Sequence, residues 1–101
     1  MVACQNQSSV GEVTLTLSIL GEEETSNFYF EDATLLDVLK LKYEVETKKT
    51  FYTEYIKCVK DVCVNDEYSW VYYVNDKPTN YGVNVYQVQD QDRVLFAYKK
   101  V

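Results

Sequence analysis

Two cysteines near the middle of the chain have the clearest potential for covalent chemistry. Cys58 and Cys63 flank the segment Val59-Lys60-Asp61-Val62. If Lys60-Asp61 forms a two-residue turn, Val59 pairs with Val62. The next pair outward, Cys58 with Cys63, is then non-hydrogen-bonded, with Cα atoms about 4.5 Å apart. A disulfide spans that distance. The spacing therefore predicts a cross-strand disulfide, with a pair of reduced, half-buried thiols as the alternative.

The chain contains no histidine. Histidine is the commonest general base, and it completes many zinc sites. A metal at Cys58 and Cys63 would need two further ligands. No spacing of Lys, Asp and Tyr assembles a nucleophile, a base and an oxyanion site. We therefore predict a protein that is not an enzyme and that has no metal site and no catalytic cofactor.

The third cysteine, Cys4, follows residues that resemble the end of a bacterial lipobox. Met1-Val2-Ala3 supplies aliphatic residues and then a small one, although Met1 stands where leucine is usual. The polar residues that follow Cys4 would make a suitable tether. We expect a lipid on Cys4 in the native precursor, with a plain tail thiol as the alternative. An odd cysteine beside a disulfide pair indicates an extracytoplasmic, cell-surface protein.

Composition restricts the partners. The 101 residues are one domain's worth of chain, and a net charge of −6 makes nucleic acids and anionic lipid surfaces poor partners. No apolar run approaches the length of a membrane span, so a lipid on Cys4 is the expected membrane contact. The ten tyrosines suit half-buried sheet positions or ligand-facing patches. We expect a monomer that binds a small molecule or another surface protein.

The N-terminal part of the domain reads as a hairpin. Apolar and polar residues alternate strictly from Glu12 to Ile19, which predicts a strand. Gly21 and the run Glu22–Glu24 predict a turn, and Asn27–Phe30 a second strand. Residues 1–11 show no hydrophobic periodicity and predict a flexible tail, which leaves 12–101 as the domain.

One helix is predicted over residues 34–44. Thr34 is suited to the N-cap, and Asp37 occupies the third helical position, as in a capping box. Apolar residues then recur at helical spacing. They are Leu35, Leu36, Leu39 and Tyr43.

Strand patterns dominate the rest of the chain. They cover Phe51–Val59, Tyr68–Val74 and Arg93–Lys100, with a stop at Asn75–Pro78, an irregular stretch at Tyr81–Gln89 and a turn at Asp90–Asp92. Two aspartates in that turn are too few for a calcium loop. A single amphipathic helix buries its apolar stripe most simply against one face of a sheet. We predict an α+β, β-grasp-like fold with one helix packed on a four- to five-stranded mixed sheet.

The second half of the chain resembles the transcobalamin C-terminal-like domain family, which includes the small β-domain of the vitamin carriers and many prokaryotic cell-surface relatives. The matching segments are Ser69–Lys77, Tyr81–Tyr86, Gln89–Val94 and Phe96–Tyr98, with Thr34–Leu39 matching the helix start. The resemblance covers about residues 12–100. Its weight rests on Trp70, Asn75, Gly82, Val83, Tyr86 and Asp92. Ser69, Asp76 and Gln91 depart from the family pattern.

The resemblance implies a site for cobalamin or another flat ligand. Aromatic residues at the strand edge and the Gly82 loop would form it: Trp70, Tyr72, Tyr81, Gly82 and Tyr86. In the vitamin carriers, a helical barrel that these 101 residues do not contain closes the other side. Trp70 also has a structural interpretation, as the large core residue of a central strand, and Gly82-Val83 as a backbone corner. The alternative function is a structural or adhesive module whose sheet edge or tyrosine-rich face meets another protein.

Overall fold

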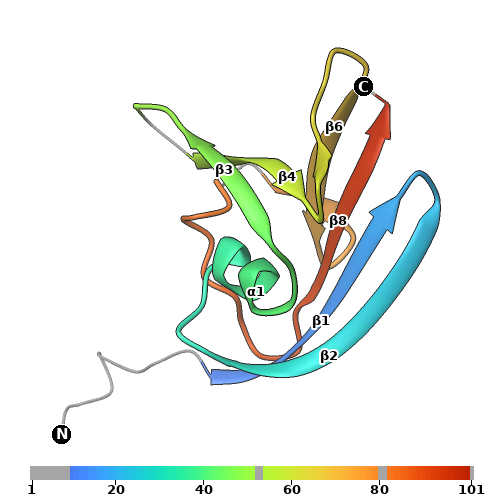
Figure 1. Ribbon diagram of the computed structural model, residues 1–101. Helices are drawn as coiled ribbons and strands as arrows, with labels where there is room; N and C mark the ends of the chain where they lie inside the picture. Colours follow the sequence, from blue (N-terminus) through green and yellow to red (C-terminus); the bar gives the residue numbers. More distant parts are fainter. Residues whose placement is uncertain (1–9, 52–53, 80–81, 101) are drawn as a thin grey trace, which may run out of the picture.

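A computed structural model describes residues 10–51, 54–79 and 82–100 (Figure 1). Its elements, in chain order, are β1 (Val10–Ile19), β2 (Glu22–Glu31), α1 (Leu35–Lys42), β3 (Val45–Lys49), β4 (Glu54–Val59), β5 (Val62–Cys63), β6 (Tyr68–Val74), β7 (Lys77–Pro78) and β8 (Arg93–Lys100).

The main sheet has five strands in the order β2-β1-β8-β6-β7. It is mixed, because β1 and β8 run parallel while the other neighbours are antiparallel. The predicted combination of one helix with a mixed sheet of this size is confirmed among the described residues. A second sheet, β3-β4-β5, was not predicted. The specific β-grasp assignment is not confirmed by this arrangement.

The core lies between one face of the main sheet and α1, which sits inside the curve of the sheet in Figure 1. Alternation along β1 turns Val13, Leu15 and Leu17 inward, while the threonines between them stay on the other face. Phe96 of β8 is fully buried beside them. Four apolar residues of α1 complete the core: Leu35, Leu36, Val38 and Leu39.

The capping box predicted at the start of α1 is present. The Asp37 amide donates to Thr34 Oγ1 at 3.2 Å, and the Thr34 amide donates to Asp37 Oδ2 at 3.0 Å. The helix is shorter than expected, because the backbone at Tyr43 is already extended. The chain then enters β3, a strand that the sequence analysis did not predict. Its charged residues are exposed at the edge of the small sheet, where they cost little.

Three two-residue turns connect neighbouring strands, each with positive φ at both central residues. This geometry matches the right-handed twist of the strands that it joins. The turns are Leu20-Gly21, Lys60-Asp61 and Asn75-Asp76.

The N-terminal hairpin corrects two sequence-based predictions. Glu22–Glu24 belongs to β2 and not to the turn, because Leu20 and Gly21 alone reverse the chain. At the other end of the hairpin, β1 begins at Val10, two residues before the expected start.

Candidate functional site

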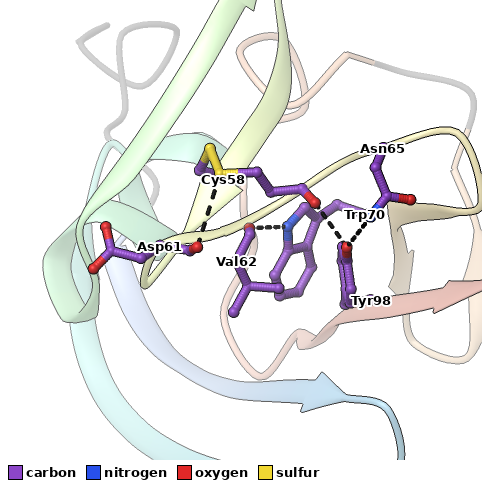
Figure 2. Close-up of a disulfide and its surroundings, with 7 residues drawn as sticks. Cys58, Asp61, Val62, Asn65, Trp70 and Tyr98 are labelled. Carbon is purple, nitrogen blue, oxygen red and sulfur yellow. Dashed lines mark hydrogen bonds between the residues drawn. A yellow bond between two sulfur atoms is a disulfide. The ribbon is translucent and has the colours of Figure 1, made fainter.

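Trp70 lies in the core of the domain and is only 6% exposed. Figure 2 shows it between Val62 and Tyr98. Its indole N–H donates to the carbonyl oxygen of Val62 at 2.9 Å, and its ring packs against Tyr98 with centroids 5.2 Å apart. The Tyr98 hydroxyl donates in turn to the carbonyl oxygen of Cys63 at 2.7 Å. Two aromatic side chains from β6 and β8 therefore hold β5 against the sheet. This position matches the structural interpretation of Trp70.

The cysteine hairpin has the register predicted from the spacing. Val59 pairs with Val62, and Cys58 lies opposite Cys63. The structure joins these two cysteines by a disulfide, with Cα atoms 4.0 Å apart. Cys58 is buried and Cys63 is partly exposed.

Tyr72, two residues beyond Trp70 on β6, is half-buried. Its ring packs against Phe96 with centroids 5.7 Å apart. Burial raises the pKa of its hydroxyl. Trp70 and Tyr72 are the two residues of β6 that were predicted to contact a ligand, and Tyr72 presents more surface to solvent than Trp70 does.

Asp92 forms a buried hydrogen-bond centre that joins three segments of the chain. Its Oδ1 accepts from Asn75 Nδ2 at 2.9 Å. Its Oδ2 accepts from the Tyr86 hydroxyl at 3.0 Å and from the Gln89 amide at 2.8 Å. Burial, followed by this hydrogen bond and the charge of Asp92, raises the pKa of Tyr86 to about 12. The family resemblance depends in part on Asn75, Tyr86 and Asp92. The sequence did not predict that Asn75 and Tyr86 both hydrogen-bond to Asp92.

The loop Gly82–Val88 is irregular but held firmly to the first turn of α1. The amides of Leu35 and Leu36 donate to the carbonyl oxygens of Tyr86 and Val83, at 3.2 and 2.9 Å. The Val88 amide donates to the Ala33 carbonyl at 2.9 Å. Within the loop, the Gly82 carbonyl accepts from the amides of Val85 and Tyr86.

The same loop presents residues that the sequence analysis did not select. Asn84 is exposed, and Val85 is 53% exposed although it is aliphatic. An exposed Asn-Val pair on a rigid loop is suited to contacting a ligand or partner. Their place directly after Gly82-Val83 was the signal available in the sequence.

The predicted ligand residues thus fall into two groups. Trp70 and Tyr72 lie on β6, and Gly82 and Tyr86 lie in the loop that reaches α1. Tyr81 and Cys4 lie outside the described residues.

Other candidate sites are occupied by internal contacts. Asp90 and Gln91 form a turn, as the sequence predicted, and Asp90 Oδ1 accepts from the Glu12 amide at 2.9 Å. That backbone hydrogen bond is the main cause that lowers the pKa of Asp90.

Within residues 10–51, 54–79 and 82–100, no three acidic or cysteine side chains gather closely enough to hold a metal ion. No helix in the same residues is long and apolar enough to cross a membrane.

A known protein family matches most of this chain. The family model described as "Domain of unknown function (DUF4430)" matches residues 32–100. The chain belongs to the DUF4430 family. No curated protein matches the sequence.

The solved structures that share the fold of this DUF4430 chain include two with informative descriptions. Haptocorrin in complex with Cbi matches with a TM-score of 0.81 and 19% identity, over 94% of this chain and 26% of haptocorrin. A candidate metal-binding protein from Ruminococcus gnavus ATCC 29149 matches with a TM-score of 0.81 and 19% identity, over 90% of this chain and 98% of that one. The DUF4430 chain therefore spans about a quarter of haptocorrin. The resemblance to the transcobalamin family is confirmed at the level of fold.

Proposed function

We propose that this DUF4430 chain is a non-catalytic, extracytoplasmic ligand-binding module that takes cobalamin or a related flat ligand. Its ligand surface would combine the exposed part of Tyr72 with the loop from Gly82 to Tyr86, and Tyr81 belongs to the same proposal. Trp70 would support this surface from the core.

The observation that carries the proposal is the match to haptocorrin, which was solved in complex with Cbi. Nearly all of this chain superposes on a domain-sized quarter of that protein. The candidate metal-binding protein from Ruminococcus gnavus shares the fold over nearly its whole length. One structure was solved with Cbi and the other is described as metal-binding, and both support a binding role for the same fold.

The loop geometry also supports a ligand role. Backbone hydrogen bonds to α1 and the Tyr86–Asp92 contact fix the conformation of Gly82–Val88 before any ligand arrives. A preorganised loop loses little entropy on binding. Tyr72 adds a half-buried aromatic ring, which suits a flat ligand.

One face of a ligand gives weak affinity, because association must first offset several kcal/mol of lost freedom. We therefore expect a second domain or a partner protein to complete the site. For the chain alone we expect a dissociation constant on the order of 1 mM. A lipid on Cys4 would hold the module at the cell surface, which stays a prediction from the sequence.

The test is titration of the 101-residue chain with cobalamin and, separately, with Cbi, followed by the absorbance of the corrin ring. We expect a saturable change that Tyr72→Leu weakens at least about fivefold, since an aliphatic side chain cannot stack on the ring. Tyr29→Ala is the matched control, because Tyr29 lies on β2 and is 79% exposed. Amide spectra establish that both variants are folded. The proposal would be overturned if neither cobalamin nor Cbi gave a saturable change in absorbance. It would also be overturned if Tyr72→Leu and Tyr29→Ala weakened binding equally.

A further inference from the structure

The outer edge of β2 carries a long row of backbone groups without a strand beside it. β2 is ten residues long and is the first strand of the main sheet, with β1 as its neighbour (Figure 1). Ile19 and Glu22, which flank the two-residue turn, form a hydrogen-bonded pair. From Glu22 onward, every second residue of β2 therefore bonds β1, and the residues between point the other way. The residues whose N–H and C=O point away from β1 are therefore Glu23, Thr25, Asn27, Tyr29 and Glu31. In the described part of the chain, no backbone partner is found for these five.

The opposite edge of the sheet is blocked to any further strand, whereas this edge is guarded only by glutamates. β7 has only two residues, and one of them is Pro78, which cannot donate to a further strand. β2 has no proline, no lysine and no arginine along its length. Short edge strands, prolines and charged side chains, lysine above all, block an edge, and the charged residues of β2 are all glutamates, which basic side chains of a partner strand would neutralise.

A hollow lies where the end of β2 meets the exposed side of α1. It measures about 530 Å³, and its apolar lining comes from Phe30, Ala33, Tyr29 and Leu41. Tyr29 and Leu41 are 79% and 64% exposed and line the same hollow, so apolar side chains face solvent together there. A strand added beside β2 would place alternate side chains on the α1 side of the sheet, next to this hollow.

The charges of β2 select the partner. Glu23 and Glu31 lie on the outer face of the sheet, near the two ends of the strand. Glu24 is already used, because the Tyr43 hydroxyl donates to it at 2.6 Å and Lys60 Nζ lies 3.5 Å away. A second copy of this chain is a poor partner. Antiparallel pairing of two β2 strands centred on Asn27 sets Glu23 opposite Glu31 twice, and like charges directly opposite destabilise a sheet.

We propose that the β2 edge binds an extended protein segment by strand addition, a segment with lysine or arginine on one face and aliphatic residues on the other. The basic side chains contact Glu23 and Glu31, and the aliphatic ones enter the hollow beside Leu41. This surface shares no residue with the ligand surface proposed at Tyr72 and Gly82–Tyr86, and it does not depend on the function proposed above.

The probe is a peptide of alternating lysine and valine, about nine residues long to match β2. It is added to the isotopically labelled 101-residue chain, and amide chemical shifts are recorded. We expect saturable shifts at Glu23, Thr25, Asn27, Tyr29 and Glu31 as their N–H groups gain acceptors. A peptide with glutamate in place of lysine should produce none up to about 1 mM.

Two matched comparisons sharpen the test. Asn27→Pro removes one outward N–H and should abolish the shifts, whereas Asn27→Ala keeps that donor and should preserve them. Glu23→Lys combined with Glu31→Lys should weaken the lysine peptide about tenfold and allow the glutamate peptide to bind. The proposal is overturned if the shifts centre on β6 and β7, if charge reversal changes nothing, or if the same five amides shift with protein concentration alone.

Discussion

The indole N–H of Trp70 donates a hydrogen bond of 2.9 Å to the carbonyl oxygen of Val62, which joins the main sheet to the small one. β5 has only two residues, so it depends on such contacts from outside its own sheet. This relationship explains why a tryptophan, and not simply a large apolar residue, occupies the middle of the domain.

Replacing Trp70 with Phe keeps an aromatic ring but removes this donor. We expect the free energy of unfolding to fall by about 1–3 kcal/mol, from the lost hydrogen bond and the smaller ring volume. Urea unfolding measures the loss as a lower midpoint at unchanged slope. Tyr73→Phe is the control, since Tyr73 hydrogen-bonds only Lys99 on the exposed face among the contacts identified, and it should change stability by less than about 0.5 kcal/mol. Equal midpoints for Trp70→Phe and the parent would contradict the assigned role.

The disulfide between Cys58 and Cys63 should form in air and should stabilise the domain modestly. The closed loop is short, so the chain-entropy model predicts about 2 kcal/mol. Because Trp70 and Tyr98 also hold β5, we expect the reduced protein to stay folded. Mass measurement after alkylation, with and without reductant, reports the thiol state, and urea unfolding reports the stability. Two free thiols in the air-oxidised, folded protein would count against this prediction.

Asp92→Asn should damage the contact between the loop and the sheet. Asp92 accepts three hydrogen bonds through its two oxygens, whereas asparagine would turn an NH₂ group toward a donor. We expect a loss of about 2–3 kcal/mol, because Asp92 is buried and its carboxylate is a charged hydrogen-bond acceptor. Asp90→Asn is the matched control, since Asp90 is exposed in the neighbouring turn. If both variants unfold at the same urea concentration, Asp92 is not the central group that the structure indicates.

Stability should fall at alkaline pH through Tyr86. The pKa of Tyr86 is raised to about 12 by burial and by Asp92, from an unfolded value of about 10. Between these two values the unfolded chain loses a proton that the folded protein keeps. The stabilisation is therefore complete below about pH 10 and is lost as the pH rises toward 12. Burial also raises the pKa of Tyr43, which adds a loss in the same direction.

Unfolding midpoints measured between about pH 9 and pH 12 check this expectation. Tyr86→Phe should flatten the alkaline decline relative to the parent, whereas Tyr29→Phe, on the exposed edge strand, should leave it unchanged. A decline of the same steepness in all three proteins would rule out Tyr86 as its source.

Local patterns in the sequence predicted the elements whose stabilising contacts lie close along the chain. The capping box at Thr34 and Asp37 involves residues three apart, and the Cys58–Cys63 register follows from one two-residue turn. The alternation in β1 and β8 needed only the period of two. Where the local signal was ambiguous, the interpretation was wrong. Three consecutive glutamates indicated a turn, yet Glu22–Glu24 extends β2 because charged side chains on an edge strand stay in water.

Tertiary structure alone decided which distant residues meet. The parallel pairing of β1 with β8 joins strands from opposite ends of the chain, and no pattern within either strand specifies that neighbour. Of the three donors to Asp92, Gln89 and Tyr86 lie only three and six residues before it, but Asn75 lies 17 residues away in another turn, and no local pattern predicted that it meets Asp92. The sequence determined that Trp70 is a large aromatic residue on a strand. Its burial depended on β5 folding back over β6, since a side chain's exposure is set by what packs on it and not by its own chemistry.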